Sequence, residues 1–194
     1  MRHISLLVVC LSVTLLTPAT SRAEDAAPAE STAESTTESG SAFRRSGGLL
    51  DRNPQERQHM LSFFAFPSWY YGFGVGTGAR YTLPLVKNGF IPPVNDSFEL
   101  EFGADAWYAG SFGYSYFAFG VPVEARWTFH FTDKFAAYAK AGLGFTLAFG
   151  DYVGVYSPVY FSSGAGVIWS ITDAFALRAE AHTQGFRVGI GFSL

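Results

Sequence analysis

The sequence predicts an all-β fold: an eight-stranded antiparallel up-and-down transmembrane β-barrel with a polar, filled interior. Three observations predict it. Charged residues make up only 15% of the chain and aromatic residues 18%, whereas an ordinary soluble domain is about one quarter charged. From Trp69 onward, large apolar residues alternate with small or polar ones at period two, which is the pattern of β-strands. The charged residues of these strands all fall on one phase of the alternation.

Residues 1–23 predict an export signal. A basic start at Arg2 and His3 is followed by the apolar run 4–16, and small residues stand at the two positions of 21–23 that a signal peptidase reads. We expect cleavage after Ala23. The alternative, a membrane anchor, is disfavoured because the apolar run is shorter than the roughly 20 residues that span a bilayer.

A lipoprotein signal at Cys10 is also disfavoured, because Val9 precedes it where a small residue is needed. Cleavage removes this single cysteine, so no disulfide is expected in the mature chain. The 13 Lys and Arg residues, less Arg2 and Arg22, then stand against 16 Asp and Glu residues. The resulting net charge of −5 gives no reason to expect a nucleic-acid partner.

Residues 24–57 are rich in Ala, Ser, Thr, Glu and Gly and show no apolar period. Such a segment buries too little surface to offset its ordering entropy, so we expect a disordered linker. The pair Arg44-Arg45 could be a docking patch, although a solvated pair is the simpler interpretation.

Seven strands follow in the alternating region, and an even number is expected of a bacterial single-chain barrel. The weakly patterned stretch 58–66 is the candidate for the eighth, so the barrel domain spans 58–194. The other seven are predicted at 69–83, 97–108, 117–131, 135–149, 159–171, 174–182 and 186–194.

Alternation alone does not say which face is outside, since a lipocalin-like soluble barrel also alternates with its apolar face inward. The apolar face carries most of the Phe and Trp, too much bulk for the interior of an eight-stranded barrel. Charge supports the same orientation, because an apolar surface in lipid must be free of charged side chains. Ten of the 16 charged residues after 68 lie on the small or polar face, five acidic and five basic, and the other six lie in connections: Arg80, Glu99, Glu101, Asp105, Glu124, Arg126, Lys140, Arg178, Glu180 and Arg187, with Lys87, Asp96, Asp133, Lys134, Asp151 and Asp173.

With both chain ends in the periplasm, the connections 132–134 and 172–174 lie there, and both carry a Thr-Asp turn. The long connection 84–96, which contains Pro92-Pro93, also falls on that side, and 109–116, 150–158 and 183–185 fall outside. Two charge-free stretches, 106–123 and 152–172, are long enough for transmembrane helices, but Gly, Ser and Pro interrupt both, and both keep period two.

The short connections also predict register, and with it an interior charge network. Pairing across 109–116 sets Phe117 opposite Tyr108 and Arg126 opposite Glu99. Pairing across 132–134 sets Lys140 opposite Arg126. The longer connection 84–96 brings Arg80 level with Glu99. Because opposed side chains on one face lie within contact, we expect a buried structural cluster that blocks the lumen toward its periplasmic half: Arg80, Glu99, Glu101, Glu124, Arg126 and Lys140.

On the outer face, Val123, Leu143 and Ile190 are expected near the middle of the bilayer. Aromatic residues gather where a barrel crosses the membrane–water interfaces. The expected periplasmic belt is Trp127, Phe129, Trp169 and Phe175, and the expected outer belt is Trp69, Tyr71, Tyr108, Phe117 and Phe149.

With this pattern laid out, residues 58–194 resemble the small OmpA/OmpX-like outer-membrane β-barrels and the "outer membrane protein β-barrel domain" group. The end of the chain, 187–194 (RVGIGFSL), carries the most specific likeness, to the family's insertion signal, with Leu194 in place of the usual terminal Phe. The resemblance implies an outer-membrane location and recognition by the barrel assembly machinery. It implies no shared activity.

Residues that could carry chemistry have structural interpretations as well. Glu99, Glu101, Asp105 and Glu124 could be acid/base carboxylates, but each has basic neighbours in the predicted register. His130 and His182 lie at opposite rims, so they cannot share a metal ion. The alternating series Gly72, Gly74, Gly76 and Gly78 resembles a phosphate-binding loop, yet it lines one face of a strand.

A lipid-modifying enzyme would need a serine or histidine near the outer-leaflet end and facing lipid. His182 lies at that end, next to Thr183, but on the inward phase, and Ser162 and Ser163 have no base within sequence reach. We therefore expect a non-catalytic outer-membrane protein with a role in envelope structure or surface interaction, no metal and no cofactor, monomeric, with outer-membrane lipid as its partner. A narrow, porin-like conduit for small solutes is the first alternative and a lipid-modifying barrel enzyme the second.

Overall fold

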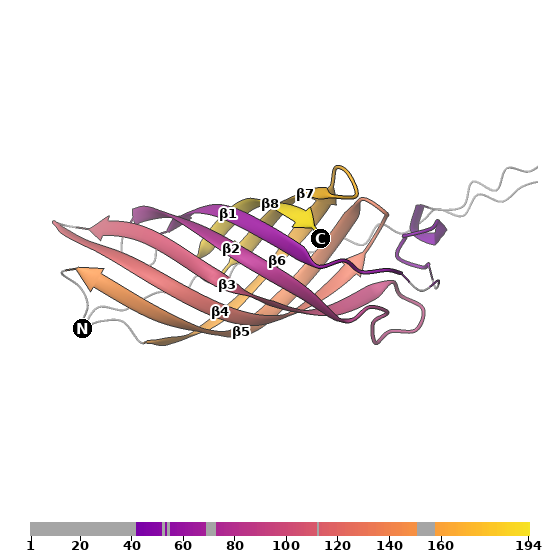
Figure 1. Ribbon diagram of the computed structural model, residues 1–194, viewed down its shortest axis with the longest axis horizontal. Helices are drawn as coiled ribbons and strands as arrows, with labels where there is room; N and C mark the ends of the chain where they lie inside the picture. Colours follow the sequence, from indigo (N-terminus) through magenta and orange to yellow (C-terminus); the bar gives the residue numbers. More distant parts are fainter. Residues whose placement is uncertain (1–41, 52, 54, 69–72, 112, 151–157) are drawn as a thin grey trace, which may run out of the picture. The chain divides into compact units, whose positions relative to one another are not determined.

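The computed structural model describes residues 42–194 except 52, 54, 69–72, 112 and 151–157. Eight antiparallel strands, each bonded to its neighbours in chain order and the last to the first, close a barrel (Figure 1). They are β1 (Met60–Ser68), β2 (Phe73–Val86), β3 (Asp96–Ser111), β4 (Tyr114–His130), β5 (Phe135–Gly150), β6 (Val159–Ser170), β7 (Phe175–His182) and β8 (Gly185–Ser193). The predicted fold class and all eight predicted strands are confirmed.

The hairpin turns explain why the strands begin and end where they do. After β4, the backbone N–H of Phe131 donates to Phe135 O, and the Thr132 hydroxyl accepts from the Phe135 N–H at 3.0 Å. The same arrangement recurs after β6, where the Thr172 hydroxyl accepts from the Phe175 N–H at 3.1 Å. Threonine side chains that bond the backbone in this way stabilise a tight turn.

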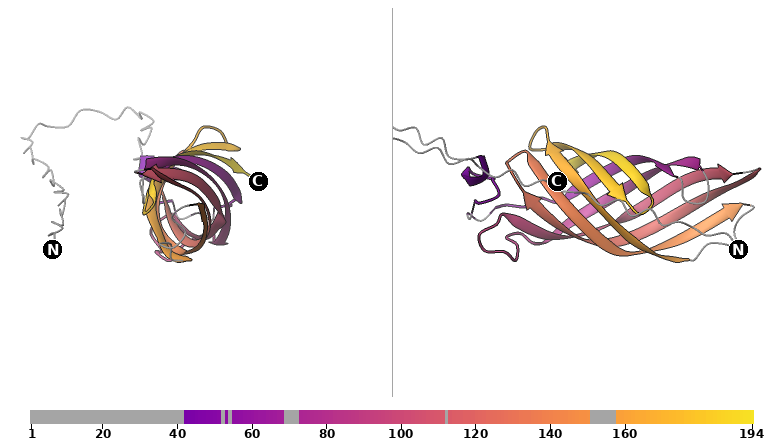
Figure 2. Two further views of the ribbon diagram at one scale, coloured as in Figure 1. Left: turned by 90° about the vertical axis from the view of Figure 1, so that its left-hand side faces the viewer. Right: turned by 180° about the vertical axis from the view of Figure 1, so that it is seen from behind.

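We call the end at which β1 begins and β8 ends the terminal end. It also carries the β4–β5 and β6–β7 turns and the β2–β3 loop, residues 87–95. Figure 2 shows the closed barrel from two further sides. At the opposite end the β3–β4 connection is shorter than the expected 109–116, because the ladder continues until Ser111 pairs with Tyr114.

The alternation places apolar side chains outside and charged side chains inside. Val123, Leu143 and Ile190 are exposed, at 48%, 60% and 37%, and so are Tyr108, Phe117 and Phe149 of the expected outer belt. Trp69 and Tyr71 lie outside the described residues. All ten charged residues of the inward phase are buried, none exposing more than 5%.

An apolar cluster inside the barrel lies toward each end, on either side of these charges. At the terminal end, Ala136, Tyr138, Ile168 and Ala176 form a buried cluster with Met60 beside it. At the opposite end the buried cluster is Phe66, Trp107, Ala109, Tyr116 and Ala118. The charged middle of the interior therefore has an apolar cluster toward each end of the barrel.

The expected disorder of 24–57 is wrong for the described part of 42–51. A 3-10 helix (Ala42–Arg44) begins it, Leu49 N donates to Phe131 O, and Asn95 N donates to Leu49 O at 2.7 Å. These bonds join the segment to the β4–β5 turn and the β2–β3 loop. Composition could not indicate this order, because both of these bonds join backbone groups, which every sequence has. Arg44 and Arg45 are exposed, as the solvated interpretation requires.

No helix among the described residues is long and apolar enough to cross a membrane. The stretch 106–123 lies in β3 and β4, and the described part of 152–172 lies mostly in β6. The predicted signal, residues 1–23, lies outside the described residues.

Candidate functional site

The inward phase of β2, β3, β4, β5, β7 and β8 brings the charged side chains together in the middle of the barrel. The register predictions for the short hairpins are confirmed, since Tyr108 pairs with Phe117, Glu99 with Arg126 and Arg126 with Lys140. Small residues make room for these long side chains. A Cβ on Gly166, for example, would lie 2.6 Å from the Tyr138 ring and 2.6 Å from Ala179 O.

Glu101 is the centre of the larger cluster. Its Oε1 accepts from Lys140 Nζ at 2.7 Å, and its Oε2 accepts from Arg126 Nη1 at 2.9 Å and Arg178 Nη2 at 2.8 Å. The Thr82 hydroxyl donates to the same Oε2 at 3.1 Å. One buried carboxylate therefore balances three cations from three different strands.

Lys140 extends the cluster across the lumen. Its Nζ lies 3.0 Å from Glu124 Oε2 and 2.8 Å from Glu180 Oε2, besides Glu101. The contact with Glu180 crosses β6, where the facing residues are Gly164 and Gly166. Without side chains on β6 at these positions, β5 and β7 can share an ion pair.

Arg126 joins Glu99 to this cluster. Its Nε lies 2.5 Å from Glu99 Oε2, which also accepts from the Thr128 hydroxyl at 2.7 Å. The guanidinium carbon lies 5.0 Å from the centre of the Tyr138 ring, at a distance where a cation is attracted to the ring face.

The prediction that Arg80 lies level with Glu99 on the neighbouring strand is wrong. Arg80 pairs with Gly103, and Glu99 pairs with Pro84, because β2 continues to Val86 through an irregularity between Pro84 and Val86. A long connection leaves the register to such local details, whereas a tight turn specifies it.

Arg80 instead belongs to a second, smaller cluster around Asp105. Arg80 Nη2 lies 2.6 Å and Arg187 Nη2 lies 3.0 Å from Asp105 Oδ2. A looser contact of 3.9 Å between Arg80 Nε and Glu124 Oε2 connects the two clusters. Of the six predicted network residues, five share the Glu101 cluster and Arg80 lies at its edge.

Four charged residues that we placed inside the barrel but left out of the predicted network belong to these clusters. Arg178 bonds Glu101 at 2.8 Å, Ser62 Oγ at 2.8 Å and Tyr138 Oη at 3.0 Å. The other three are Asp105, Glu180 and Arg187. Their inward phase was visible in the sequence. The contacts of Arg187 with Asp105, of Lys140 with Glu180 and of Arg178 with Glu101 join strands that are not neighbours, so pairwise strand register does not give them.

Serine, histidine and glutamate side chains contact one another at two places in the barrel. The first group corrects the expectation that Ser162 has no base within reach. Ser162 Oγ lies 3.0 Å from His182 Nε2, although no base was expected within its reach. The Ser162 hydroxyl donates to Glu124 Oε1 at 2.6 Å, and His182 Nε2 lies 3.2 Å from the same oxygen. Strands β6 and β7 bring the two side chains together.

The hydrogen bonds make His182 unsuited to act as a base for Ser162. The backbone N–H of Gln184 donates to His182 Nδ1 at 3.2 Å, so Nδ1 carries the lone pair and Nε2 the proton in the neutral ring. A catalytic triad needs the reverse, with a lone pair toward the serine and the carboxylate on the other nitrogen. Ser162 is also completely buried.

Ser97, His130 and Glu99 form a similar group near the terminal end. The Ser97 hydroxyl donates to Glu99 Oε1 at 3.0 Å and lies 3.0 Å from His130 Nε2. Both groups satisfy buried polar atoms at the edges of the charge network. Among the described residues, no group of three or more His, Cys, Asp or Glu is arranged to hold a metal ion.

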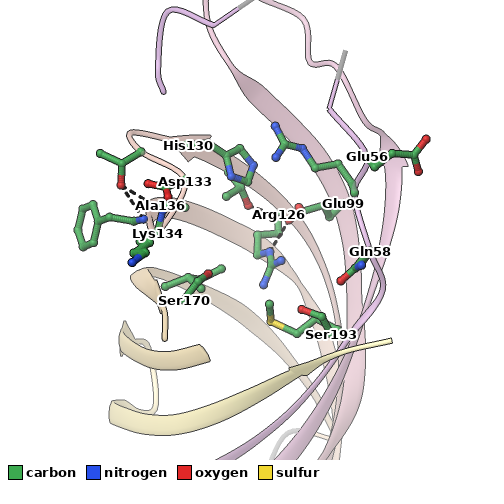
Figure 3. A pocket seen from close by; sticks show the side chains of 16 residues that line it. Glu56, Gln58, Glu99, Arg126, His130, Asp133, Lys134, Ala136, Ser170 and Ser193 are labelled. Atoms are coloured by element: carbon green, nitrogen blue, oxygen red, sulfur yellow. Dashed lines mark hydrogen bonds and ion pairs between the residues drawn. The ribbon is translucent and has the colours of Figure 1, made fainter. Parts of the chain in front are cut away.

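A pocket of about 200 Å³ lies at the terminal end, next to the charge network. Figure 3 shows the Arg126–Glu99 ion pair in it, with Gln58 and Ser193 on one side and Lys134 and Ala136 on the other. Arg57, His130 and Thr128 also line it. The sequence did not predict this pocket, because the segment 56–58 that closes one side was expected to be partly disordered linker.

Asp51 stabilises the turns of the docked N-terminal segment at the same end. Its carboxylate accepts from the backbone N–H of Gly47 at 2.8 Å and of Asn53 at 3.0 Å, and from the Gln55 amide at 2.9 Å. These backbone hydrogen bonds lower the pKa of Asp51 from its ordinary value, because they favour the ionised carboxylate.

Comparison with known proteins gives a likeness in fold only. No protein-family model and no curated protein sequence matches the chain. Six solved chains match, among them one described as "De novo design of transmembrane beta-barrels". That chain is 15% identical over 73% of this chain and 100% of its own length, with a TM-score of 0.47. We draw no functional conclusion from so distant a likeness.

Proposed function

We propose that the chain is an integral outer-membrane protein whose barrel is closed to solutes, with a non-catalytic role in envelope structure or surface interaction. The observation that carries the proposal is the division of side chains between the two faces of the barrel. In the described strands every charged side chain is buried, and the outer face carries large apolar residues at up to 75% exposure.

Lipid explains this outer face better than water does. A monomeric soluble protein rarely exposes a contiguous apolar patch of more than a few hundred Å², whereas here apolar residues cover the outside of strands all round the barrel. A charged side chain near the middle of a bilayer costs about 2–4 kcal/mol, which accounts for the lack of exposed charged side chains on the outer face of the described strands.

The interior supports a closed barrel rather than a conduit. Five acidic and five basic residues pair with one another in the middle of the lumen, and an apolar cluster lies toward each end of the barrel. The pocket at the terminal end reaches Arg126 and Glu99, which are already joined. The hydrogen bonds of His182 likewise favour a structural role for the Ser162 group over a catalytic one.

The orientation follows from the even number of strands. Bacterial barrels of this kind keep both chain ends in the periplasm, so the terminal end faces the periplasm and β8 presents the assembly signal 187–194. We propose export through residues 1–23, insertion by the barrel assembly machinery and a monomeric state in the lipid.

Cell fractionation and bilayer recording test the proposal together. The exported chain should begin at Glu24, remain in the outer-membrane fraction until detergent is added, and migrate faster on a gel before heating than after it. Purified barrel should add no steady conductance to a planar bilayer. A chain recovered in the soluble periplasm without detergent would refute the location, and stable ion channels would replace the closed barrel with the conduit.

A further inference from the structure

The β2–β3 loop, residues 87–95, has an apolar composition that its place at a polar rim does not explain. Between Asn88 and Asn95 it carries no charged residue, and its tip reads FIPPV (90–94). Phe90 is 60% exposed, and Leu85 just before the loop is 53% exposed. A connection that extended into water would be expected to carry polar residues at its tip.

Phe90 lies against the outer wall of the barrel. Its ring contacts Phe98 edge-on at a centroid distance of 5.6 Å and Trp127 at 6.3 Å. Both partners stand on the outward phase of their strands, β3 and β4, and Trp127 also stacks on Phe129 at 5.2 Å. The tip of the loop therefore extends the apolar outer face at the terminal end.

Asp96 shows what the loop covers. It stands opposite Phe129 on the outward phase, one residue before inward Ser97, yet it is only 1% exposed. The sequence analysis placed this residue in a connection, but it begins β3. Its carboxylate accepts from Trp127 Nε1 at 2.6 Å and from the Phe90 N–H at 3.2 Å. The loop thus shields the one carboxylate on the outer phase of the described strands.

Most backbone N–H groups of the loop have hydrogen-bond acceptors within the protein. Eight residues from Gly89 to Asp96 include two prolines, which leaves six N–H groups, and five of these donate to protein oxygens. Four of these bonds stay within the loop and β3: Gly89 N to Asp96 O, Phe90 N to Asp96 Oδ2, Val94 N to Ile91 O and Asp96 N to Val94 O. An N–H group without a hydrogen-bond acceptor is costly in a layer with little water. A loop whose N–H groups are bonded within the protein can therefore enter such a layer.

The docked N-terminal segment holds the loop from its other side. Arg57 Nε donates to Lys87 O at 3.3 Å, Gln55 N donates to Asn88 Oδ1 at 3.1 Å, and Asn95 Nδ2 donates to Gly48 O at 3.2 Å. A loop fixed on both sides presents its apolar tip with little further loss of conformational freedom.

We infer that the β2–β3 loop is an interfacial anchor whose partner is the phospholipid surface on the terminal side of the membrane. Phe90, Pro92 and Pro93 enter the glycerol and headgroup level, where aromatic and uncharged side chains are favoured. Trp127 and Asp96 latch the loop to the wall. The inference rests on the proposed function and adds a membrane contact beyond the strands.

Nitroxide labels at single cysteines test the anchor. The chain from Glu24 onward contains no cysteine, so an introduced cysteine is the only one. Phe90→Cys, Leu143→Cys and Lys134→Cys report the loop tip, the outer wall and an exposed turn at the same end. The full barrel is placed in vesicles of phosphatidylethanolamine and phosphatidylglycerol. Accessibility to oxygen and to a polar nickel chelate then ranks the three depths.

We expect the ratio of oxygen to nickel accessibility at residue 90 to exceed that at 134 and to fall below that at 143. A label at 90 that is as open to the nickel chelate as the label at 134 overturns the anchor while the proposed function stands. If the label at 143 is equally open to the chelate, the proposed function itself fails.

Trp127→Phe removes the hydrogen bond to Asp96 and keeps an aromatic ring on the wall. With the label at 90, this variant should shift the loop toward the nickel chelate and leave the label at 143 unchanged. No shift at residue 90 would refute the latch. A loop that another copy of the chain covers would instead give spin–spin broadening at residue 90, which would overturn a lipid partner.

Discussion

Replacing Glu101 by Gln should destabilise the barrel more than any other single charge removal in the lumen. The substitution keeps the shape of the side chain and removes its charge. Three cations lose their shared carboxylate at distances of 2.7–2.9 Å, and the interior changes from five acids and five bases to four acids and five bases. A glutamine amide would also place a donor against at least one of these donors.

The magnitude follows from the burial of the partners. Glu101, Lys140 and Arg178 have fully buried side chains, and removing one partner of a buried ion pair costs about 3–5 kcal/mol because the other charge is left uncompensated. The free energy of unfolding of a typical domain is about 5–15 kcal/mol. We therefore expect Glu101→Gln to lose a large part of the total stability.

Urea unfolding of the barrel in lipid vesicles, followed by tryptophan fluorescence, measures this loss. Glu56→Gln is the matched control, because Glu56 pairs with Lys87 at 3.6 Å on the surface and an exposed pair contributes about 0–1 kcal/mol. Lys140→Met added to Glu101→Gln restores neutrality, so the double variant should lose less than the sum of the single losses.

Two results would contradict this account of the interior. If Glu101→Gln costs no more than Glu56→Gln, water already solvates the network and the charges are not buried against one another. If stability is kept while ion conductance in a planar bilayer rises, the same residues line a wet pore, and the conduit replaces the closed barrel.

Three further predictions concern the outer face, the crowded interior and the docked segment. Leu143→Arg should cost about 2–4 kcal/mol of unfolding free energy in vesicles, whereas Ala174→Arg, in an exposed turn, should cost almost nothing; equal losses would show that the outer face does not contact lipid. Gly166→Ala should cost about 1–3 kcal/mol of unfolding free energy by overpacking, since the added Cβ would lie 2.6 Å from both the Tyr138 ring and Ala179 O. Its control, Ala165→Val on the outer phase, should leave the urea midpoint nearly unchanged. The pKa of Asp51 is lowered from its ordinary value of 3.8, so its ionised carboxylate stabilises the docked segment at pH values above 3.8. This stabilisation is lost as the pH falls below 3.8 through the folded-state pKa. NMR titration should show the Gly47 and Asn53 amides losing their bonded shifts in that range, and Asp51→Asn should remove the transition; the same transition in that variant would assign it to another group.

The sequence by itself determined the strands, their faces and the pairing across short turns. Alternation at period two assigns each residue to a face, and a tight turn leaves one register, so the pairing of Glu99 with Arg126 and of Arg126 with Lys140 could be predicted. The lack of charge on the apolar phase also distinguished outside from inside, because a lipid-facing surface and a filled lumen make opposite demands on charge.

Only the tertiary structure decided the contacts that depend on closure of the barrel and on long connections. Arg178 and Glu101 are 77 residues apart in the chain and meet across the lumen, at a distance that strand tilt and stagger determine. Arg80 was displaced by four residues because the long β2–β3 connection leaves its register open. Contacts of this kind arise from the geometry of the closed sheet, whereas the pattern along one strand reports only that strand's two faces.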